Sequence, residues 1–239
     1  MATIAGKAVL VTGSSRGIGR ALVQEALDRG AARVYAAARQ PVPAAGERVT
    51  PLVLDVTSPE QIRQAAAAVP ALDVLVNNAG HYRNDDLGDR AVLEEHLAVN
   101  LLGLHGVTQA FVPQLAASAG AVVNNLSLQA FAPLPLTASY SMSKAAAFSL
   151  TQSLRTILGA RGVRVHAVLT GPVDTDMTRG LDVPKVSPEA VAAAILDGVE
   201  KDEEDIFPDP MSLGMAEGWH TGQAKAFERE LAAMARAAG

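Results

Sequence analysis

Residues 8–19 read AVLVTGSSRGIG, a short apolar run that leads directly into a glycine-rich segment. An apolar run of this length that ends in glycine is typical of a buried strand, and residues 17–29 have the pattern of a helix that follows it. Gly13, Gly17 and Gly19 let the backbone turn tightly and approach a pyrophosphate, whose charge meets the N–H groups at the start of that helix. The stretch therefore predicts a strand, a phosphate-binding loop and a helix; a glycine-rich turn without a ligand is the alternative.

Beyond this stretch, short apolar runs alternate with longer segments of helical pattern. Most of the runs are apolar on both faces, as strands of a parallel sheet between two layers of helices must be. We therefore predict an α/β fold, a single doubly wound (Rossmann) domain with a parallel sheet of roughly seven strands flanked by helices. The predicted strands are residues 8–11, 34–37, 51–54, 74–76, 121–123 and 163–169, and the predicted helices are residues 17–29, 59–69, 90–117, 138–160 and 188–201.

The length of 239 residues is compatible with one such domain. We expect residues 1–239 to form it, with residues 202–239 as a C-terminal loop and helix extension. Residues 202–222 are rich in proline, aspartate, glycine and methionine, and we predict that they form an ordered loop system near the substrate opening.

Composition and charge argue against several classes of protein. The apolar fraction of 49% is too high for a disordered chain, and a net charge of −5 without a basic stripe is unlike a nucleic-acid-binding protein. Without cysteine there is no disulfide, and the five histidines lack paired ligand spacing, so no metal is predicted. The first residues are unlike a signal peptide and no apolar stretch is long enough to span a bilayer, so we expect a cytoplasmic protein without membrane contact.

The segment Thr12–Gly19, Thr-Gly-x-x-x-Gly-x-Gly, resembles the nucleotide-binding signature of the short-chain dehydrogenase/reductase family. Other motifs of that family follow in its order and spacing, and the resemblance covers residues 6–200. These motifs are Asp55-Val56 after the third predicted strand, Asn77-Asn78-Ala79-Gly80 after the fourth, Val99-Asn100 in the next helix, Ser127 after the fifth strand, and Tyr140-Ser141-Met142-Ser143-Lys144.

The spacing of Tyr140 and Lys144 has a chemical reason. Four residues apart on a helix, the two side chains share one face, and a nearby ammonium favours the phenolate and so lowers the tyrosine pKa. The resemblance implies that Tyr140 is the general acid–base, that Lys144 lowers its pKa and holds the nicotinamide ribose, and that Ser127 orients the substrate. It also implies that Asn100 supports a water-linked proton path through the lysine. The alternative for a tyrosine and lysine at this spacing is an ordinary helix surface.

The second predicted strand indicates which nicotinamide cofactor binds. Family members that use NAD place an acidic residue at its end, where Ala38 stands here, followed by Arg39. Arg39 and Arg16 could both bind a 2′-phosphate, so we predict NADP(H); two solvated surface arginines are the alternative. Thr170 replaces the proline of a common family Pro-Gly. The resemblance implies this set of cofactor-binding residues: Gly13, Ser15, Arg16, Gly17, Ile18, Gly19, Arg39, Asp55, Val56, Asn78, Ala79, Gly80, Tyr140, Lys144, Val173 and Thr175.

These motifs predict hydride transfer between NADPH and a carbonyl or secondary alcohol, with a small-molecule ketone or aldehyde as substrate. A non-catalytic NADP(H)-binding sensor on the same fold is one alternative, and a 3-ketoacyl-carrier-protein reductase is another. Apolar positions on the helices over residues 90–117 and 138–160 lead us to expect a homodimer or homotetramer. The candidate substrate-binding residues are chiefly apolar: His81, Leu128, Gln129, Phe131, Leu134, Thr170, Met177 and Leu181.

Overall fold

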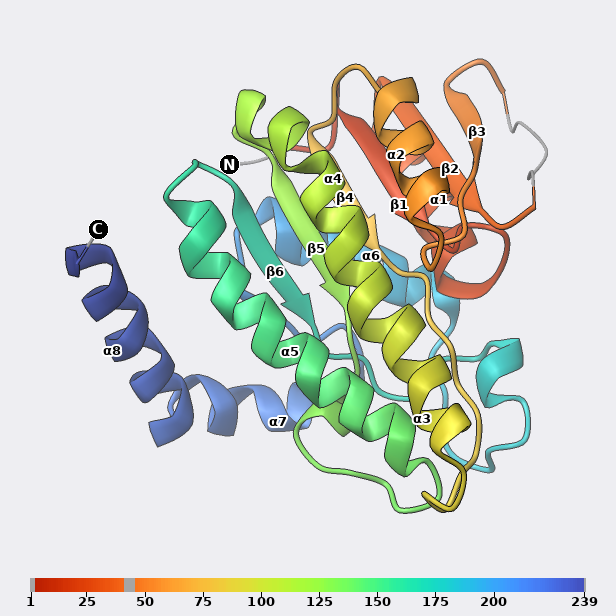
Figure 1. The fold of residues 1–239 in the computed structure, drawn as a ribbon, viewed down its shortest axis with the longest axis vertical. Helices are drawn as coiled ribbons and strands as arrows, with labels where there is room; N and C mark the ends of the chain where they lie inside the picture. The colour runs from red at the N-terminus through yellow and green to blue at the C-terminus, as the bar shows by residue number, and fades with distance from the viewer. Residues whose placement is uncertain (1–2, 41–45, 239) are drawn as a thin grey trace.

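The computed structural model describes residues 3–40 and 46–238 and contains a parallel sheet of seven strands in the order β3-β2-β1-β4-β5-β6-β7. The predicted doubly wound α/β fold is thereby confirmed (Figure 1). The strands are β1 (Ala8–Thr12), β2 (Arg33–Ala38), β3 (Val49–Val53), β4 (Val74–Asn77), β5 (Ala121–Asn125), β6 (Arg164–Val168) and β7 (Asp205–Ile206).

Alternate side chains of each strand point to opposite faces of the sheet, and both faces are covered by helices. Val9 and Val11 of β1 pack into a core with α1 (Gly17–Asp28) and α6 (Pro188–Glu200). Leu10, between them, belongs to the core on the other face. That face is covered by α2 (Pro59–Ala68), α4 (Leu104–Ala117) and α5 (Ala138–Gly159), which lie in front of the sheet in Figure 1.

The strand order reverses at β1, which pairs with β2 on one side and with β4 on the other. The connections from β1 and β4 therefore leave the sheet in opposite directions. In open α/β sheets, such a reversal opens a crevice at the carboxyl ends of the strands, where ligands bind. The glycine loop, residues 13–19, follows the carboxyl end of β1 at this crevice.

The helix predicted over residues 90–117 is interrupted. It consists of α3 (Arg90–Leu97), a π-helical segment (Ala98–Gly103) and α4. A π-helical segment adds a residue to the turn and re-aims the side chains around it, and such segments are frequent at functional sites. Here the segment contains Asn100.

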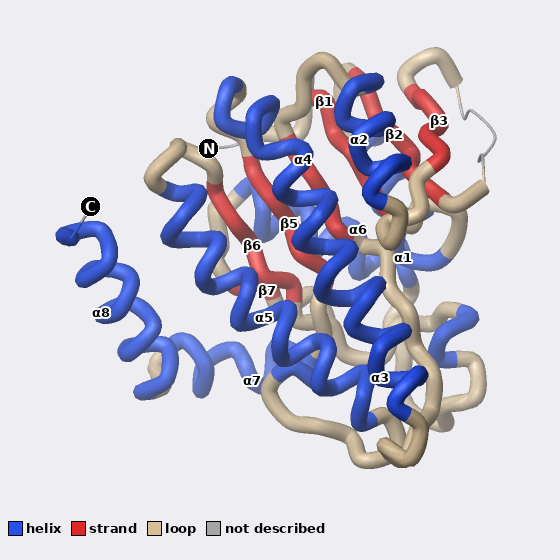
Figure 2. The backbone as a smooth tube through the Cα atoms, viewed as in Figure 1, coloured by secondary structure: helices blue, strands red, loops and turns tan. Residues whose placement is uncertain are grey.

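The prediction of a loop system over residues 202–222 is wrong for most of that segment. It contains β7 and then α7 (Pro210–His220), and α8 (Gln223–Ala238) follows, as Figure 2 shows. Asp209 caps α7 by accepting hydrogen bonds from the N–H groups of Met211 and Ser212 at 3.1 and 3.0 Å. Among the described residues, no helix is both long and apolar enough to cross a membrane.

Buried ion pairs fasten the C-terminal helices to the sheet. The Lys225 ammonium of α8 has almost no exposed surface and lies 2.7 Å from the Asp205 carboxylate of β7. Arg155 of α5 reaches the same carboxylate, also at 2.7 Å. The Trp219 indole N–H of α7 donates to it at 2.8 Å. One buried carboxylate thus receives donors from three helices, so its charge is paired and α7 and α8 are held in place.

Candidate active site

A cavity of about 590 Å³ lies at the carboxyl ends of β1, β4, β5 and β6. Every residue predicted to bind the cofactor lines it, as do most residues predicted to bind substrate. Asn100 and Phe131 are the predicted site residues that do not. The structure therefore brings the glycine loop and the Tyr140 region to one cavity, although they are far apart in the sequence.

The glycine loop is packed so closely that side chains cannot replace its hydrogens. Gly13 and Gly17 have φ angles of 66° and 52°, which favour glycine. A Cβ on Gly19 would lie 2.2 Å from the Gly13 carbonyl oxygen, and a Cβ on Gly13 would lie 2.8 Å from the Ala79 Cα. Because α1 begins at Gly17, its free N–H groups lie at the cavity. The loop thus forms a cradle for an anion.

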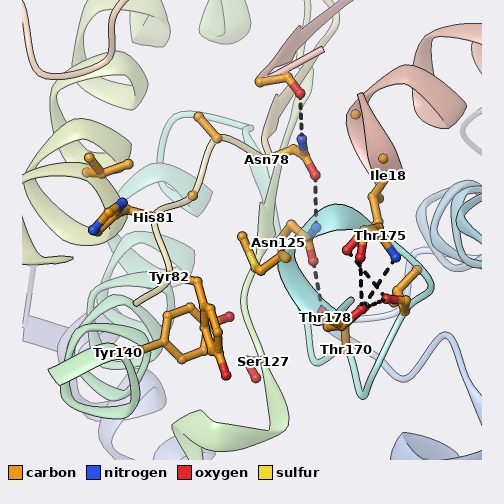
Figure 3. Close-up of a pocket in the computed structure, with 18 of the residues that line it drawn as sticks. Ile18, Asn78, His81, Tyr82, Asn125, Ser127, Tyr140, Thr170, Thr175 and Thr178 are labelled. Carbon is orange, nitrogen blue, oxygen red and sulfur yellow. Dashed lines mark hydrogen bonds between the residues drawn. The ribbon is translucent and has the colours of Figure 1, made fainter. Parts of the chain in front are cut away.

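A row of polar side chains runs across the floor of the cavity (Figure 3). The Asn78 amide donates to the Thr12 carbonyl at 3.0 Å, and the Asn125 amide donates to the Asn78 side-chain oxygen at 3.0 Å. The Thr170 hydroxyl donates to the Asn125 side-chain oxygen at 3.1 Å. This row connects the ends of β1, β4, β5 and β6. Asn125 lies outside the predicted set, and only its place at the end of a strand, two residues before Ser127, could have indicated it.

Tyr140, Lys144 and Ser127 lie together at the other end of the cavity, and all three side chains are largely buried. The Lys144 ammonium lies 5.6 Å from the centroid of the Tyr140 ring and donates to the Asn125 carbonyl at 2.9 Å. Ser127 begins the short helical turn Leu128–Ala130. The predicted helical spacing therefore does place the phenol and the ammonium side by side.

The predicted lowering of the Tyr140 pKa by Lys144 stays a prediction, because burial dominates the pKa of both groups here. Burial raises the pKa of the Tyr140 phenol to about 12, against a smaller lowering by its hydrogen bond to Ser127. Burial also lowers the pKa of the Lys144 ammonium to about 8. Burial is the largest cause for both groups, and the ammonium faces the tyrosine ring and donates to the Asn125 carbonyl.

Asn100 reaches the site indirectly. Its carboxamide oxygen accepts from the His81 N–H at 2.8 Å, and its amide donates to the His81 carbonyl at 2.9 Å and to the Ser143 hydroxyl at 2.9 Å. Ser143 in turn donates to the Tyr140 carbonyl at 2.7 Å. Asn100 therefore fixes the turn after β4 against the helix that carries Tyr140.

Two of the predicted substrate residues are oriented differently from the prediction. The Phe131 ring stacks on Trp219 with centroids 4.6 Å apart, in an aromatic cluster behind the cavity. His81 borders the cavity, but its imidazole points away from Tyr140 (Figure 3), with its ring centroid 4.8 Å from that of His96. Tyr82, which was not predicted, lines the cavity instead, with its ring edge-on to Tyr140 at 5.1 Å.

The other predicted substrate residues line the cavity, together with Val183 and Met211. The apolar residues of this group come from three segments of the chain, residues 128–134, residues 177–183 and Met211 of α7. Residues 202–222 thus reach the cavity through Met211 of α7, and their predicted place near the substrate opening stays a prediction. The predicted residues placed here are Leu128, Gln129, Leu134, Thr170, Met177 and Leu181.

Both arginines that were predicted to bind the 2′-phosphate line the cavity. Arg16 is largely exposed and pairs with the Asp176 carboxylate at 3.0 Å. Arg39 follows β2, and its charge contributes to lowering the pKa of Asp55, whose main cause is the hydrogen bonds from Thr57. Both guanidiniums therefore border the cavity without being buried in the fold, Arg39 just beyond β2 and Arg16 beside Asp176 in the loop after β6.

Comparison with known proteins agrees with this arrangement. The family model described as short chain dehydrogenase matches residues 7–185. The 3-oxoacyl-(acyl-carrier-protein) reductase FabG of Vibrio harveyi is 33% identical over 190 residues, which are 74% of this chain and 78% of that protein. Estradiol 17-beta-dehydrogenase 2 of Mus musculus is 33% identical over 219 residues, 84% of this chain; the chain spans only 56% of that protein's length.

A solved structure resembles the whole fold. It is a short-chain dehydrogenase from Burkholderia cenocepacia in complex with NADP, with a TM-score of 0.88 and 34% sequence identity. The match covers 96% of this chain and 99% of that one. With the seven-stranded parallel sheet, the glycine cradle and the family match over most of its length, this chain belongs to the short-chain dehydrogenase/reductase family of oxidoreductases.

Proposed function

We propose that this protein reduces a neutral ketone or aldehyde with NADPH, and oxidises the corresponding alcohol in reverse. The observation that carries the proposal is one cavity with an anion cradle at one end and a buried phenol, serine hydroxyl and ammonium at the other. A binding-only sensor would need the first end but has no use for a proton donor at the second.

The residues at the first end fit a dinucleotide. Gly13 and Gly19 let the backbone of the loop pack tightly, since a Cβ at either position would overlap protein atoms, and the N–H groups at the start of α1 can then meet a phosphate. Asp55 and Val56 line the cavity beyond β3, in keeping with contact to the adenine ring. Val173 and Thr175 also line the cavity, with the Thr175 side chain close to Gly17 of the glycine loop, and we assign both to the carboxamide end of the nicotinamide. When bound, NADPH supplies the hydride.

Side chains of the protein would then donate the proton that the substrate oxygen needs. Because its pKa is raised to about 12, the Tyr140 phenol stays protonated at neutral pH and can donate to the substrate oxygen as that oxygen gains negative charge. Ser127 would hold the same oxygen, and the Lys144 ammonium would stabilise the phenolate left behind. In the reverse direction the phenolate accepts the alcohol proton.

The substrate end suggests a neutral, chiefly apolar molecule. Among the described residues, the arginines and lysines that line the cavity are Arg16, Arg39 and Lys144, and the two arginines lie at the phosphate end. A carboxylate or phosphate on the substrate would therefore meet no free counter-charge beside Leu134, Met177 or Met211. A ketoacyl chain carried by an acyl-carrier protein remains the second candidate, because FabG is among the relatives.

A substrate panel tests the proposal. Purified protein is incubated with NADPH or NADH and with apolar ketones, aromatic aldehydes, 2-keto acids and acetoacetyl thioesters, and absorbance loss at the nicotinamide band is followed. We expect turnover of uncharged ketones or aldehydes with NADPH. Preference for the thioester supports the ketoacyl candidate, and NADPH binding without turnover of any member supports the sensor.

Lys144→Ala is expected to raise the KM for NADPH and lower kcat together, each by about tenfold or more, since a hydrogen bond to a charged group is worth about 1.5–3 kcal/mol. In the unmodified protein, the same loss is expected as pH rises through about 8, where the ammonium becomes neutral. Initial rates over a pH series give both results. If the variant binds NADPH as tightly as the unmodified protein, the double role of Lys144 is wrong.

We also propose that the protein self-associates through α4, α5 and the segment before them. Leu102, in the π-helical segment before α4, and Ile157 of α5 have 63% and 61% of their surface exposed and would supply apolar contacts to such an interface. Light scattering at micromolar concentration is expected to give a multiple of 24.7 kDa. A single mass of one chain would contradict this expectation, as would an unchanged mass in a Leu102→Glu, Ile157→Glu double variant if the unmodified protein is a multimer.

A further inference from the structure

One peptide group of the cavity wall is held at both ends. The Thr170 carbonyl accepts from the Leu128 N–H at 3.0 Å, and the Gly171 N–H donates to the Asp209 carboxylate at 2.7 Å. Leu128 directly follows Ser127, and Asp209 precedes α7. The peptide between Thr170 and Gly171 therefore connects the segment of the active-site serine to the C-terminal helices.

Asp209 makes more contacts than a helix cap requires. One carboxylate oxygen accepts from the Met211 and Ser212 N–H groups, which is the usual cap. The other oxygen is left for Gly171, and the side chain is almost wholly buried at 2% exposure. A buried carboxylate requires this number of donors, so the contact to Gly171 completes its hydrogen bonding.

Gly171 is packed against this carboxylate. A Cβ at position 171 would lie 2.6 Å from a carboxylate oxygen of Asp209, so the close approach requires glycine. On the other side of the peptide, the Thr170 hydroxyl lies 3.1 Å from both the Asn125 side-chain oxygen and the Leu126 carbonyl, and these two acceptors share its one proton. The loop is thus fixed by hydrogen bonds from both flanks at the point where it enters the cavity wall.

We infer that Asp209 is a positioning residue for cofactor binding. It acts through Gly171 on the loop to Thr175, whose residues Val173 and Thr175 line the cavity at the end proposed for the nicotinamide. Asp209 itself does not line the cavity, but Met211 in the first turn of the helix it caps does. The inference rests on the proposed function, because it assumes that this loop contacts the cofactor.

Asp209→Asn tests the inference. The amide oxygen of asparagine can still cap α7, but its NH2 group would face the Gly171 N–H, so two donors meet and only the contact to the loop is broken. We expect the Kd and KM for NADPH to rise at least tenfold, with a smaller change in kcat. Asp89→Asn is the matched control, because Asp89 caps α3 through the Ala91 N–H and is exposed outside the cavity; its NADPH Kd should not change.

A purely structural role predicts a different result: a lower melting temperature with an unchanged NADPH Kd in the folded protein. That result with Asp209→Asn overturns the inference. If the unmodified protein itself binds no NADPH, the proposed function fails instead, so the two failures are distinguishable.

A double-mutant cycle covers the case in which Asp209→Asn does not fold. Gly171→Ala places a methyl group against the Asp209 carboxylate. Asp209→Ser keeps a side-chain oxygen that can cap α7 but removes the carboxylate that this methyl group would meet. We expect the rise in NADPH KM caused by Gly171→Ala to be several-fold smaller in the Asp209→Ser background. Equal effects in both backgrounds contradict the coupling.

Discussion

Replacing Tyr140 with phenylalanine is expected to lower kcat at least about a hundredfold while leaving the affinity for NADPH nearly unchanged, which is the scale of general acid catalysis. The substitution removes only the phenolic oxygen. The ring keeps its edge-on contact to Tyr82 at 5.1 Å, and the Lys144 ammonium keeps its bond to the Asn125 carbonyl. The fold and the cofactor contacts should therefore survive while the proton donor is lost.

Three measurements separate these effects: kcat with a saturating ketone, the NADPH Kd by fluorescence titration, and the melting temperature. Tyr35→Phe is the matched control, because Tyr35 is a buried tyrosine of β2 that does not line the cavity, and it should retain wild-type turnover. If Tyr140→Phe keeps more than a tenth of the wild-type kcat, Tyr140 is not the proton donor.

The sheet could be predicted from the sequence because its strands are apolar on both faces. Strands such as β4 and β5 are buried along their whole length, so their residues carry a continuous apolar signal. The two-residue strand β7 was missed, because two residues carry no pattern. Its position depends on the pairing of Ile206 with Val168, a contact between distant parts of the chain.

Among the helices, too, some features could be predicted from the sequence and others could not. Residues 90–117 have helical pattern throughout, and nothing local marks the π-helical segment, which is associated with the hydrogen bonds of Asn100 to His81 and Ser143. In contrast, α7 was missed although its start was visible. Asp209-Pro210 is an N-cap followed by proline at the first helical position, a recognised helix-start signal.

At the active site, the motifs predicted which residues lie together, but not their pKa values or the orientation of their side chains. Helical spacing places Lys144 beside Tyr140, yet the direction of the Tyr140 pKa depends on burial, which spacing does not reveal. Likewise, adjacency to the turn after β4 indicated His81, whereas the backbone turns Tyr82 toward the cavity. Such orientations depend on packing between segments distant in sequence.

The choice between NADPH and NADH depends on the end of β2. Ala38 lines the cavity where an acidic side chain would otherwise accept hydrogen bonds from the ribose hydroxyls, and Arg39 follows it. Arg16 of the glycine loop also lines the cavity, where its guanidinium pairs with Asp176. We expect a 2′-phosphate here to meet the guanidinium of Arg39 and, once it leaves Asp176, that of Arg16. The ribose of NADH would meet no carboxylate at position 38, where the acidic residue of NAD-dependent family members stands.

The ion pair between Arg16 and Asp176 does not oppose this reading. Arg16 has 72% and Asp176 has 43% of its side-chain surface exposed, and pairs this exposed contribute only about 0–1 kcal/mol. A phosphate with charge near −2 can therefore compete for the guanidinium at little cost. Arg39 is exposed, and its carboxylate neighbour Asp55 already receives hydrogen bonds from Thr57.

We therefore expect kcat/KM with NADPH to exceed that with NADH by about a hundredfold or more, since each charged hydrogen bond is worth about 1.5–3 kcal/mol and about 1.4 kcal/mol is a factor of ten. Ala38→Asp combined with Arg39→Leu should reduce or reverse this preference, because it places a carboxylate beside the ribose hydroxyls and removes one guanidinium. Arg63→Leu, which removes an exposed arginine of α2 outside the cavity, is the control and should leave the ratio unchanged. Equal kcat/KM with the two cofactors in the unmodified protein would show that the arginines at positions 16 and 39 are solvated surface residues, because a bound 2′-phosphate flanked by two guanidiniums cannot be energetically neutral.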